Sequence, residues 1–184
     1  DPLWTGKMAA AQLRGMHKYN VTGTIKHFAC NNQETNRHGV EAVVSERALR
    51  EIYLKGFEIA VKEGGAYSIM TSYNPVNGYW TASNYALLPT ILRGEWGYTG
   101  IVMTDWWAKG NFLPGEKGEL INTAAKARAQ NDLNMVNPDA SDKKCDNALE
   151  AMKAKKVPRG EYQRCALNIC NYLLRTPAFD RMLH

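Results

Sequence analysis

The sequence predicts an α/β fold built on a parallel sheet. Short β-like segments alternate along the chain with amphipathic helical segments, which is the pattern of repeated strand–helix units. One segment, residues 100–105, is an almost continuous apolar run, as expected for a parallel strand covered on both faces. Polar side chains follow several of the predicted strands at their C-terminal ends, where parallel α/β folds place their functional sites.

The first third of the chain predicts a helix, a strand and a second helix. Residues 6–17 have a helical pattern, and residues 23–28 (GTIKHF) read as the first strand. Ser45 is a good N-cap for the next helix because its hydroxyl can accept a bond from a free backbone N–H. Gly64-Gly65 ends that helix. Its apolar residues recur every three or four positions and predict one buried face, made of Leu49, Ile52, Tyr53, Phe57, Ala60 and Val61.

The middle of the chain repeats the pattern. Residues 67–73 predict a second strand, ended by the turn-forming residues 74–78 (NPVNG). A helix follows around Pro89, which fits best in the first turn, where a missing N–H breaks no bond. Gly94 and Gly97 are expected to mark its end. The apolar residues that line this helix are Leu87, Leu88, Ile91 and Leu92.

The last third predicts a helix over about residues 119–129 and a fourth strand at 132–136. Two helices, over about residues 142–155 and 159–174, close the chain. Four strands are half the number in a (β/α)8 barrel. Half a barrel leaves two unpaired sheet edges and an open core, so we expect the chain to be incomplete and unstable on its own.

Composition narrows the class of protein. The chain has 184 residues, of which 45% are apolar and 22% charged, as in an ordinary globular domain. No segment approaches the ~18 consecutive apolar residues that suggest a membrane span. The net charge is +5, but its excess lies among acidic neighbours on predicted helix surfaces. Nucleic-acid binding predicts a sustained basic patch with interleaved aromatics, so neither a membrane nor a nucleic acid is expected as a partner.

The N-terminal residues and the cysteines bear on location. The opening Asp-Pro-Leu-Trp has neither a basic region nor an apolar stretch behind it, so we expect a start in mid-protein, with any targeting segment outside the chain. The cysteines lack the C-x-x-C spacing of a zinc or redox site, and free, buried thiols are expected. Free thiols favour a reducing, cytoplasmic compartment. The four are Cys30, Cys145, Cys165 and Cys170.

Polar or aromatic residues end three successive predicted strands: Lys26-His27, Tyr73-Asn74 and Asp105-Trp106-Trp107. Parallel barrels place their active sites at this end of the sheet. A single polar strand end is equally well explained by a strand that reaches the surface. Three together predict a functional site.

Three longer segments carry a family resemblance. Residues 26–37 (KHFACNNQETNR), 70–78 (MTSYNPVNG) and 92–106 (LRGEWGYTGIVMTDW) resemble, in this order, motifs of family 3 glycoside hydrolases. The resemblance covers roughly residues 1–140, and the remainder matches only as the helical end of the barrel domain. It implies a β-glucosidase-type enzyme with a (β/α)8 TIM-type barrel, of which this chain is the second half.

Carried onto this sequence, the resemblance makes Asp105 the catalytic nucleophile. Its carboxylate attacks the anomeric carbon, and water then releases the sugar from the covalent glycosyl-enzyme with retained configuration. The residues alone leave other roles open: Asp105 could cap a helix, while His27, Met70 and Trp107 could simply pack. The substrate-binding residues that the resemblance implies are Lys26, His27, Arg37, Met70, Tyr73 and Trp106.

Hydrolysis also needs a second carboxyl group as general acid. In the resembling enzymes another domain supplies it, so residues 1–184 are expected to be a partial catalytic barrel domain of a larger multidomain enzyme, inactive alone. Glu34 is expected to brace Arg37 or Lys26, and Glu46 is the other carboxylate considered for the acid. Residues 31–36 lack the Gly/His-rich loop of the N-acetylglucosaminidase branch, and Trp106 stands where xylosidase-like members tend to have Cys.

The expected reaction is release of terminal β-D-glucosyl residues from β-glucosides or short β-linked oligosaccharides, as in cellulose degradation. The expected partners are this substrate and the remaining segments of the same enzyme, with no cofactor and no metal. The alternatives are a non-catalytic carbohydrate-binding relative and a β-xylosidase-type member of the family. An unrelated α/β barrel enzyme would require all three motifs to coincide by chance.

Overall fold

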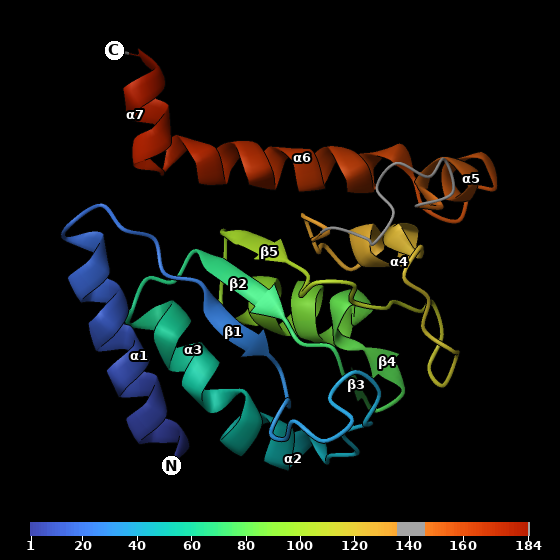
Figure 1. The fold of residues 1–184 in the computed structure, drawn as a ribbon, viewed down its shortest axis with the longest axis horizontal. Helices are drawn as coiled ribbons and strands as arrows, with labels where there is room; N and C mark the ends of the chain where they lie inside the picture. The colour runs from blue at the N-terminus through green and yellow to red at the C-terminus, as the bar shows by residue number, and fades with distance from the viewer. Residues whose placement is uncertain (136–145, 184) are drawn as a thin grey trace.

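A computed structural model describes residues 1–135 and 146–183 (Figure 1). Its helices and strands follow in the order α1 (Pro2–His17), β1 (Ile25–Phe28), α2 (Glu46–Ala48), η1 (Leu49–Tyr53), α3 (Lys55–Lys62), β2 (Ser68–Thr71), β3 (Pro75–Val76), β4 (Tyr79–Trp80), η2 (Thr81–Ser83), η3 (Ala86–Glu95), β5 (Ile101–Met103), α4 (Thr123–Arg128), α5 (Ala148–Lys153), α6 (Arg159–Leu174) and α7 (Pro177–Leu183). The fold is α/β, as predicted.

The central sheet has the strand order β1-β2-β5, and all of its pairs are parallel. Ile69 of β2 lies opposite Ile25 on one side and Val102 on the other. The predicted fourth strand is reduced, within the described residues, to a parallel bridge between Leu133 and Met103. Val136 lies outside the described residues. Among residues 1–135 and 146–183, no strand pairs with the free edge of β1.

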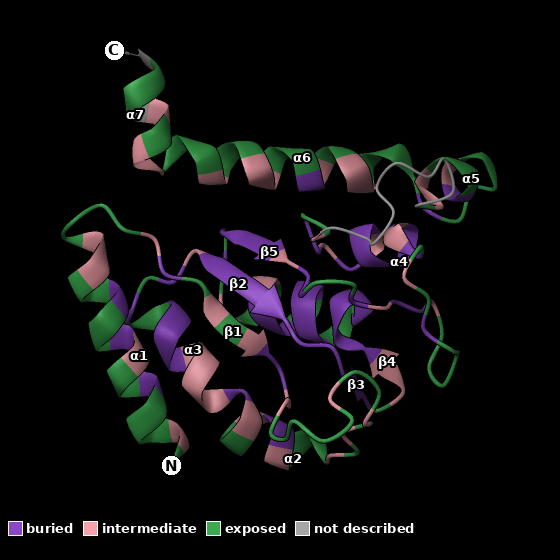
Figure 2. Ribbon diagram, in the orientation of Figure 1, coloured by how far each residue is buried: buried purple, intermediate pink, exposed green. Residues whose placement is uncertain are grey.

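Helices cover the sheet. α1 and α3 pack against each other beside β1, and α6 runs along the β5 side (Figure 1). Figure 2 shows β2 and β5 buried, whereas α6 buries only a narrow stripe. In the core, Phe28 meets Phe57 and Trp96 edge-on, with ring centroids 5.1 and 6.0 Å apart. Burying such an aromatic side chain stabilises the fold by about 1.5–3 kcal/mol, so these contacts hold β1 to the helices.

The helical segment after Ser45 differs from the prediction in one respect. The cap is confirmed, because Ser45 Oγ accepts the N–H of Ala48 at 3.3 Å. The predicted buried face is wrong at Ile52, whose exposed fraction is 53%. The cause is the π-helical turn η1, in which the extra residue rotates the helix by part of a turn. As a result Leu54 and Ile59 are buried instead.

Other boundaries were also mispredicted. Residues 74–78 are not a plain turn but part of the β3–β4 hairpin, whose Asn77-Gly78 corner has φ of 49° and 86°, as a type I′ turn requires. Pro89 lies inside η3 and not in its first turn as predicted, because the helical bonds already begin with Leu88 N–H to Asn84 O at 3.1 Å, and Gly94 also lies inside this helix. Its end is followed by Gly97, with φ of +68°.

The C-terminal helices agree in part with the predicted helix bounds. α4 begins at Thr123, later than predicted, because Asn122 caps it by accepting the N–H of Ala125. α6 has the predicted bounds, whereas α7 was not predicted. Residues 142–145 of the predicted penultimate helix lie outside the described residues, and α5 begins at Ala148.

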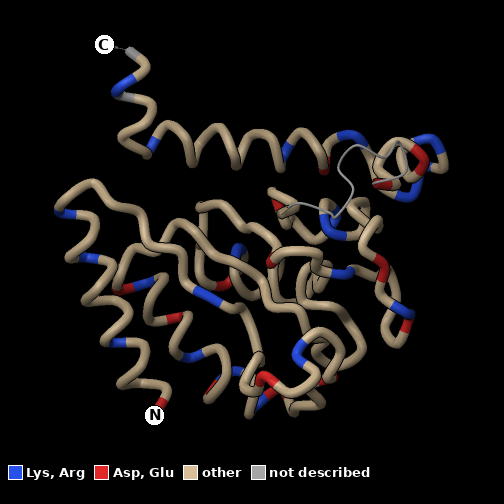
Figure 3. The backbone as a smooth tube through the Cα atoms, in the orientation of Figure 1, with Lys and Arg blue, Asp and Glu red and all other residues tan. Residues whose placement is uncertain are grey.

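The surface charges are mixed. Figure 3 shows Lys and Arg interspersed with Asp and Glu along the described chain. None of the described helices has the length and apolar character needed to cross a membrane. Cys30, Cys165 and Cys170 are free, but Cys170 is exposed, so the expectation of burial was wrong there because α6 turns this side to the surface. Cys145 lies outside the described residues.

Candidate active site

A cavity of about 520 Å³ opens at the C-terminal end of the sheet. Its walls come from the ends of all three parallel strands and from the loop that follows β1. Six of the predicted site residues meet there, together with a seventh residue, Trp107. The lining residues are Lys26, His27, Arg37, Tyr73, Asp105, Trp106 and Trp107.

Asp105 is the carboxylate of this cavity. It follows β5 directly after Thr104, and only 5% of its surface is exposed. The backbone N–H of Trp106 donates to its Oδ1 at 2.7 Å, and His27 Nε2 lies 3.3 Å from its Oδ2. These contacts fix the carboxylate in one orientation at the cavity wall.

His27 contacts Asp105 as a neutral ring. Burial lowers the pKa of His27, and this effect exceeds the opposing influence of the Asp105 charge. The nearby Lys26 and Arg37 charges lower the pKa further. At neutral pH the contact therefore joins an uncharged imidazole and a carboxylate, and the cavity gains no positive charge from His27.

Tyr73 is a second neutral donor beside Asp105. Burial raises the pKa of its hydroxyl, and the Asp105 charge and the hydrogen bond to that carboxylate raise it further. The phenol therefore stays protonated and can donate. The Arg37 guanidinium lies 5.3 Å from the centroid of the Tyr73 ring, a cation–π arrangement that places the cation at the cavity.

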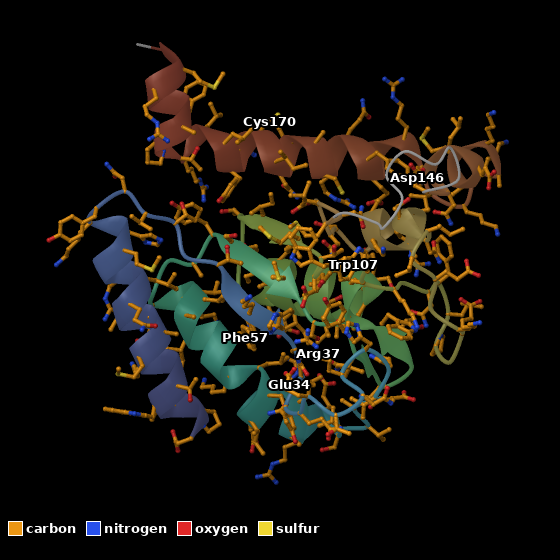
Figure 4. The ribbon with its side chains drawn as sticks, in the orientation of Figure 1. Glu34, Arg37, Phe57, Trp107, Asp146 and Cys170 are labelled. Carbon is orange, nitrogen blue, oxygen red and sulfur yellow. The ribbon has the colours of Figure 1, made fainter. Side chains whose placement is uncertain are left out.

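The loop after β1 positions Arg37. Glu34 forms an ion pair with it at 3.2 Å, which confirms the expected bracing contact (Figure 4). This pair is solvent-exposed and adds little stability. Glu46, the other carboxylate considered for the general acid, does not line the cavity. It pairs with Arg50 on the helix surface.

One predicted site residue lies elsewhere, one residue beside the site was missed, and one residue had been left open. Met70 is buried within β2 beside Met103 and does not line the cavity. His38 was not singled out, although its ring lies 4.1 Å from that of Tyr73. The only signal for it was its position directly after Arg37. Trp107 was left open as a residue that could simply pack, but it is 47% exposed and lines the cavity.

The arrangement suits a neutral polyhydroxylated ring. Lys26 and Arg37 supply charged donors, Tyr73 and His27 supply neutral ones, and Trp106 supplies an apolar face. Asp105 is the one carboxylate among the residues that line this cavity. Within the described residues, no group of three or more His, Cys, Asp or Glu side chains could hold a metal ion.

Comparisons with known proteins identify the family of this chain. The sequence pattern described as "Glycosyl hydrolase family 3 N terminal domain" matches residues 1–170. A β-glucosidase of Ruminococcus albus is 52% identical over 183 residues, which are 100% of this chain and 19% of that relative. An exo-α-(1→6)-L-arabinopyranosidase of Bifidobacterium longum is 36% identical over 187 residues, covering 100% of this chain and 24% of that relative.

A solved structure gives the same result. The crystal structure of a β-glucosidase from Paenibacillus barengoltzii superposes with a TM-score of 0.92 at 60% identity, over 97% of this chain and 20% of that chain. The chain thus spans about a fifth of the length of the proteins it matches. By sequence and by fold, the chain belongs to glycosyl hydrolase family 3, within the N-terminal domain of that family.

Proposed function

We propose that this chain carries the nucleophile and most of the sugar-binding side chains of a retaining β-glucosidase. The observation that carries the proposal is the setting of Asp105: a 5% exposed carboxylate, oriented by Trp106 N–H and His27, at the wall of a cavity with cationic and aromatic sides. The β-glucosidase relatives support glucose as the sugar, and short β-linked oligosaccharides are substrates of this kind.

The proposed reaction has two steps. Asp105 attacks the anomeric carbon, the bond to the leaving oxygen breaks, and a general acid protonates that oxygen. Water then attacks the same carbon from the other side, gives a proton to the same group, and frees the Asp105 carboxylate. Two inversions leave the configuration retained.

The general acid is proposed to lie outside this chain. Among the cavity-lining residues only Asp105 is a carboxylate, and it is already used as the nucleophile. We therefore place the acid on another segment of a larger multidomain enzyme. The free edge of β1 supports the related proposal that the sheet is an arc of a (β/α)8 barrel, whose other strands are supplied by that enzyme.

The stereochemistry of hydrolysis tests the proposed function. In the complete enzyme, the first sugar released from 4-nitrophenyl β-D-glucoside is expected to be β-glucose, because displacement occurs twice at one carbon. Proton NMR of the anomeric signals, recorded before mutarotation, measures this directly. The α-anomer appearing first would contradict a covalent nucleophile.

A substrate panel accompanies that experiment. The β-D-glucoside is expected to be cleaved with a higher kcat/KM than the β-D-xyloside or the α-L-arabinopyranoside, the last included because one relative is an arabinopyranosidase. Glucose binding without cleavage of any glycoside would instead identify a non-catalytic carbohydrate-binding relative.

The sugar-binding side chains give a second test. Replacing Lys26, His27 or Arg37 with Ala in the complete enzyme removes a buried or charge-assisted hydrogen bond to a sugar hydroxyl. Each loss is expected to cost ~1.5–3 kcal/mol, or roughly ten- to a hundred-fold in kcat/KM. Lys7→Ala is the matched control. Lys7 is an exposed residue of α1 that pairs with Glu63 at the end of α3 and does not line the cavity. If all three site variants behaved like this control, these residues would belong to the scaffold.

A further inference from the structure

Two adjacent residues of the loop after β1 contact the ring of Tyr73. The ring centroid of His38 lies 4.1 Å from that of Tyr73, with 43° between the planes, and the Arg37 guanidinium carbon lies 5.3 Å from the same centroid. Arg37 lines the cavity, whereas His38 is an exposed residue that does not line it. His38 is therefore placed to act on Tyr73 and not on a bound sugar.

The loop presents His38 from a fixed backbone. The two backbone N–H groups that follow His38 both donate to Asn36 O, at 2.9 and 2.8 Å, so a tight turn brackets this residue. The loop is then tied to the β3–β4 hairpin, because the N–H of Ala42 donates to Pro75 O at 3.0 Å (Figure 1). Tyr73 comes two residues before Pro75, so the loop is anchored close to the ring that it contacts.

The other contacts of the Tyr73 ring hold it less firmly. The ring is buried, but the buried apolar side chains that pack with it are those of Ala82 and Ala108, each of which offers a single methyl group. The Arg37 side chain is 37% exposed, and its guanidinium is already a proposed sugar donor. Within the described part of the chain, His38 supplies the one aromatic ring that stacks on Tyr73.

The orientation of Tyr73 matters because its hydroxyl donates to the Asp105 carboxylate. A hydrogen bond weakens steeply when its angle departs from linearity, and a small displacement of a reacting group can lower the rate strongly. Resting on the proposed function, we infer that His38 is a positioning residue for hydrolysis. Its ring holds the Tyr73 ring so that the phenol O–H stays directed at the nucleophile.

A double-mutant cycle in the complete enzyme tests this inference. We expect His38→Ala to lower kcat/KM for 4-nitrophenyl β-D-glucoside about three- to tenfold, the range that corresponds to an aromatic pair. Tyr73→Phe keeps the ring and removes the hydroxyl through which His38 is inferred to act. In the Tyr73→Phe background, His38→Ala is therefore expected to cause a further loss of less than about twofold.

Conservative substitution separates positioning from a general effect on folding. His38→Phe restores a flat ring without a titratable group, so it is expected to recover most of the wild-type kcat/KM, with the thermal midpoint of unfolding unchanged in both His38 variants. His38→Gln gives the same readout as His38→Ala should the latter fail to fold, because it also lacks an aromatic ring.

The chain offers a matched control at the other end of β2. His17 stacks on Tyr67, just before that strand, with ring centroids 5.1 Å apart and 34° between the planes. Neither residue lines the cavity. His17→Ala thus removes the same kind of contact away from Asp105 and is expected to leave kcat/KM unchanged.

Two results would overturn the inference. An equal loss in the wild-type and Tyr73→Phe backgrounds would show that His38 acts on the loop or on Arg37 and not through the phenol. Wild-type kinetics in His38→Ala would show that the stacking does not matter for hydrolysis. In both cases the wild-type enzyme still cleaves the glucoside and the proposed function stands, whereas no cleavage by the wild-type enzyme would contradict the proposed function and the inference with it.

Discussion

Replacing Asp105 with Asn in the complete enzyme is expected to lower kcat/KM for β-glucosides by on the order of 10³ or more. The substitution keeps the shape of the side chain and removes the negative charge that attacks the anomeric carbon. Sugar binding is expected to survive, because the donors on Lys26, Arg37 and Tyr73 remain. Steady-state kinetics and calorimetric titration with glucose measure the two quantities separately.

A variant with no side chain at position 105 gives a second test of the same prediction. Asp105→Gly leaves space in the cavity for azide, which can attack the anomeric carbon in place of the carboxylate. The expected product is α-glucosyl azide, since only one inversion then occurs. Glu51→Gln is the matched control, because Glu51 is an exposed carboxylate that pairs with Arg47 and does not line the cavity. Near-wild-type activity in Asp105→Asn, or a β-glucosyl azide product, would contradict the role of Asp105.

The second large effect is expected at the buried ion pair of Arg93 and Asp132. Arg93 Nη2 lies 2.6 Å from Asp132 Oδ2, and the two side chains are 10% and 0% exposed. Asp132 also accepts the N–H of Val102 in β5 at 2.8 Å and the side-chain amide of Asn168 in α6 at 2.8 Å. The pair thus joins η3, β5 and α6.

Asp132→Ala is expected to destabilise this part of the enzyme by ~3–5 kcal/mol, because it leaves the Arg93 charge buried without a partner. Hydrogen exchange of the peptide that contains β5, followed by mass spectrometry, measures the loss of protection. Burial raises the pKa of Asp132 even beside Arg93, which shows that desolvation is the larger effect. The double variant Asp132→Ala with Arg93→Leu is therefore expected to regain part of the stability.

An exposed pair provides the control for that experiment. Arg47→Ala removes an ion pair with Glu51 in which both side chains are mostly exposed, so it is expected to change stability by no more than about 1 kcal/mol. Unchanged exchange in Asp132→Ala would show that the buried pair does not support β5.

The sequence was informative about the site because strand ends are set by simple patterns. The apolar run before Asp105 and the polar ends at His27 and Tyr73 indicated that these side chains share one edge of a parallel sheet, and the structure brings them into one cavity. Their roles in catalysis and binding stay predictions. The binding role of Met70 also stays a prediction, and its side chain is buried in β2 and does not line the cavity.

What the sequence missed depends on backbone geometry that periodicity does not encode. Ile52 was expected to be buried because helical spacing assumes an uninterrupted α-helix, and the π turn at residues 49–53 breaks that assumption. For Trp107 the sequence left packing open as an alternative, whereas the residue has a left-handed φ of +56° and its ring lines the cavity. In both cases one unusual turn redirects a side chain.

Covalent trapping tests the central claim most directly. A 2-deoxy-2-fluoro β-glucoside with a good leaving group slows both steps by destabilising the oxocarbenium-like transition state, and the leaving group restores only the first. The complete enzyme is then expected to lose activity as one sugar accumulates on it. Mass spectrometry of the digested protein should place that sugar on Asp105, in the peptide spanning residues 101–107. A label on Glu34 or Glu46, or on any other carboxylate, would contradict the assignment of Asp105 as the nucleophile.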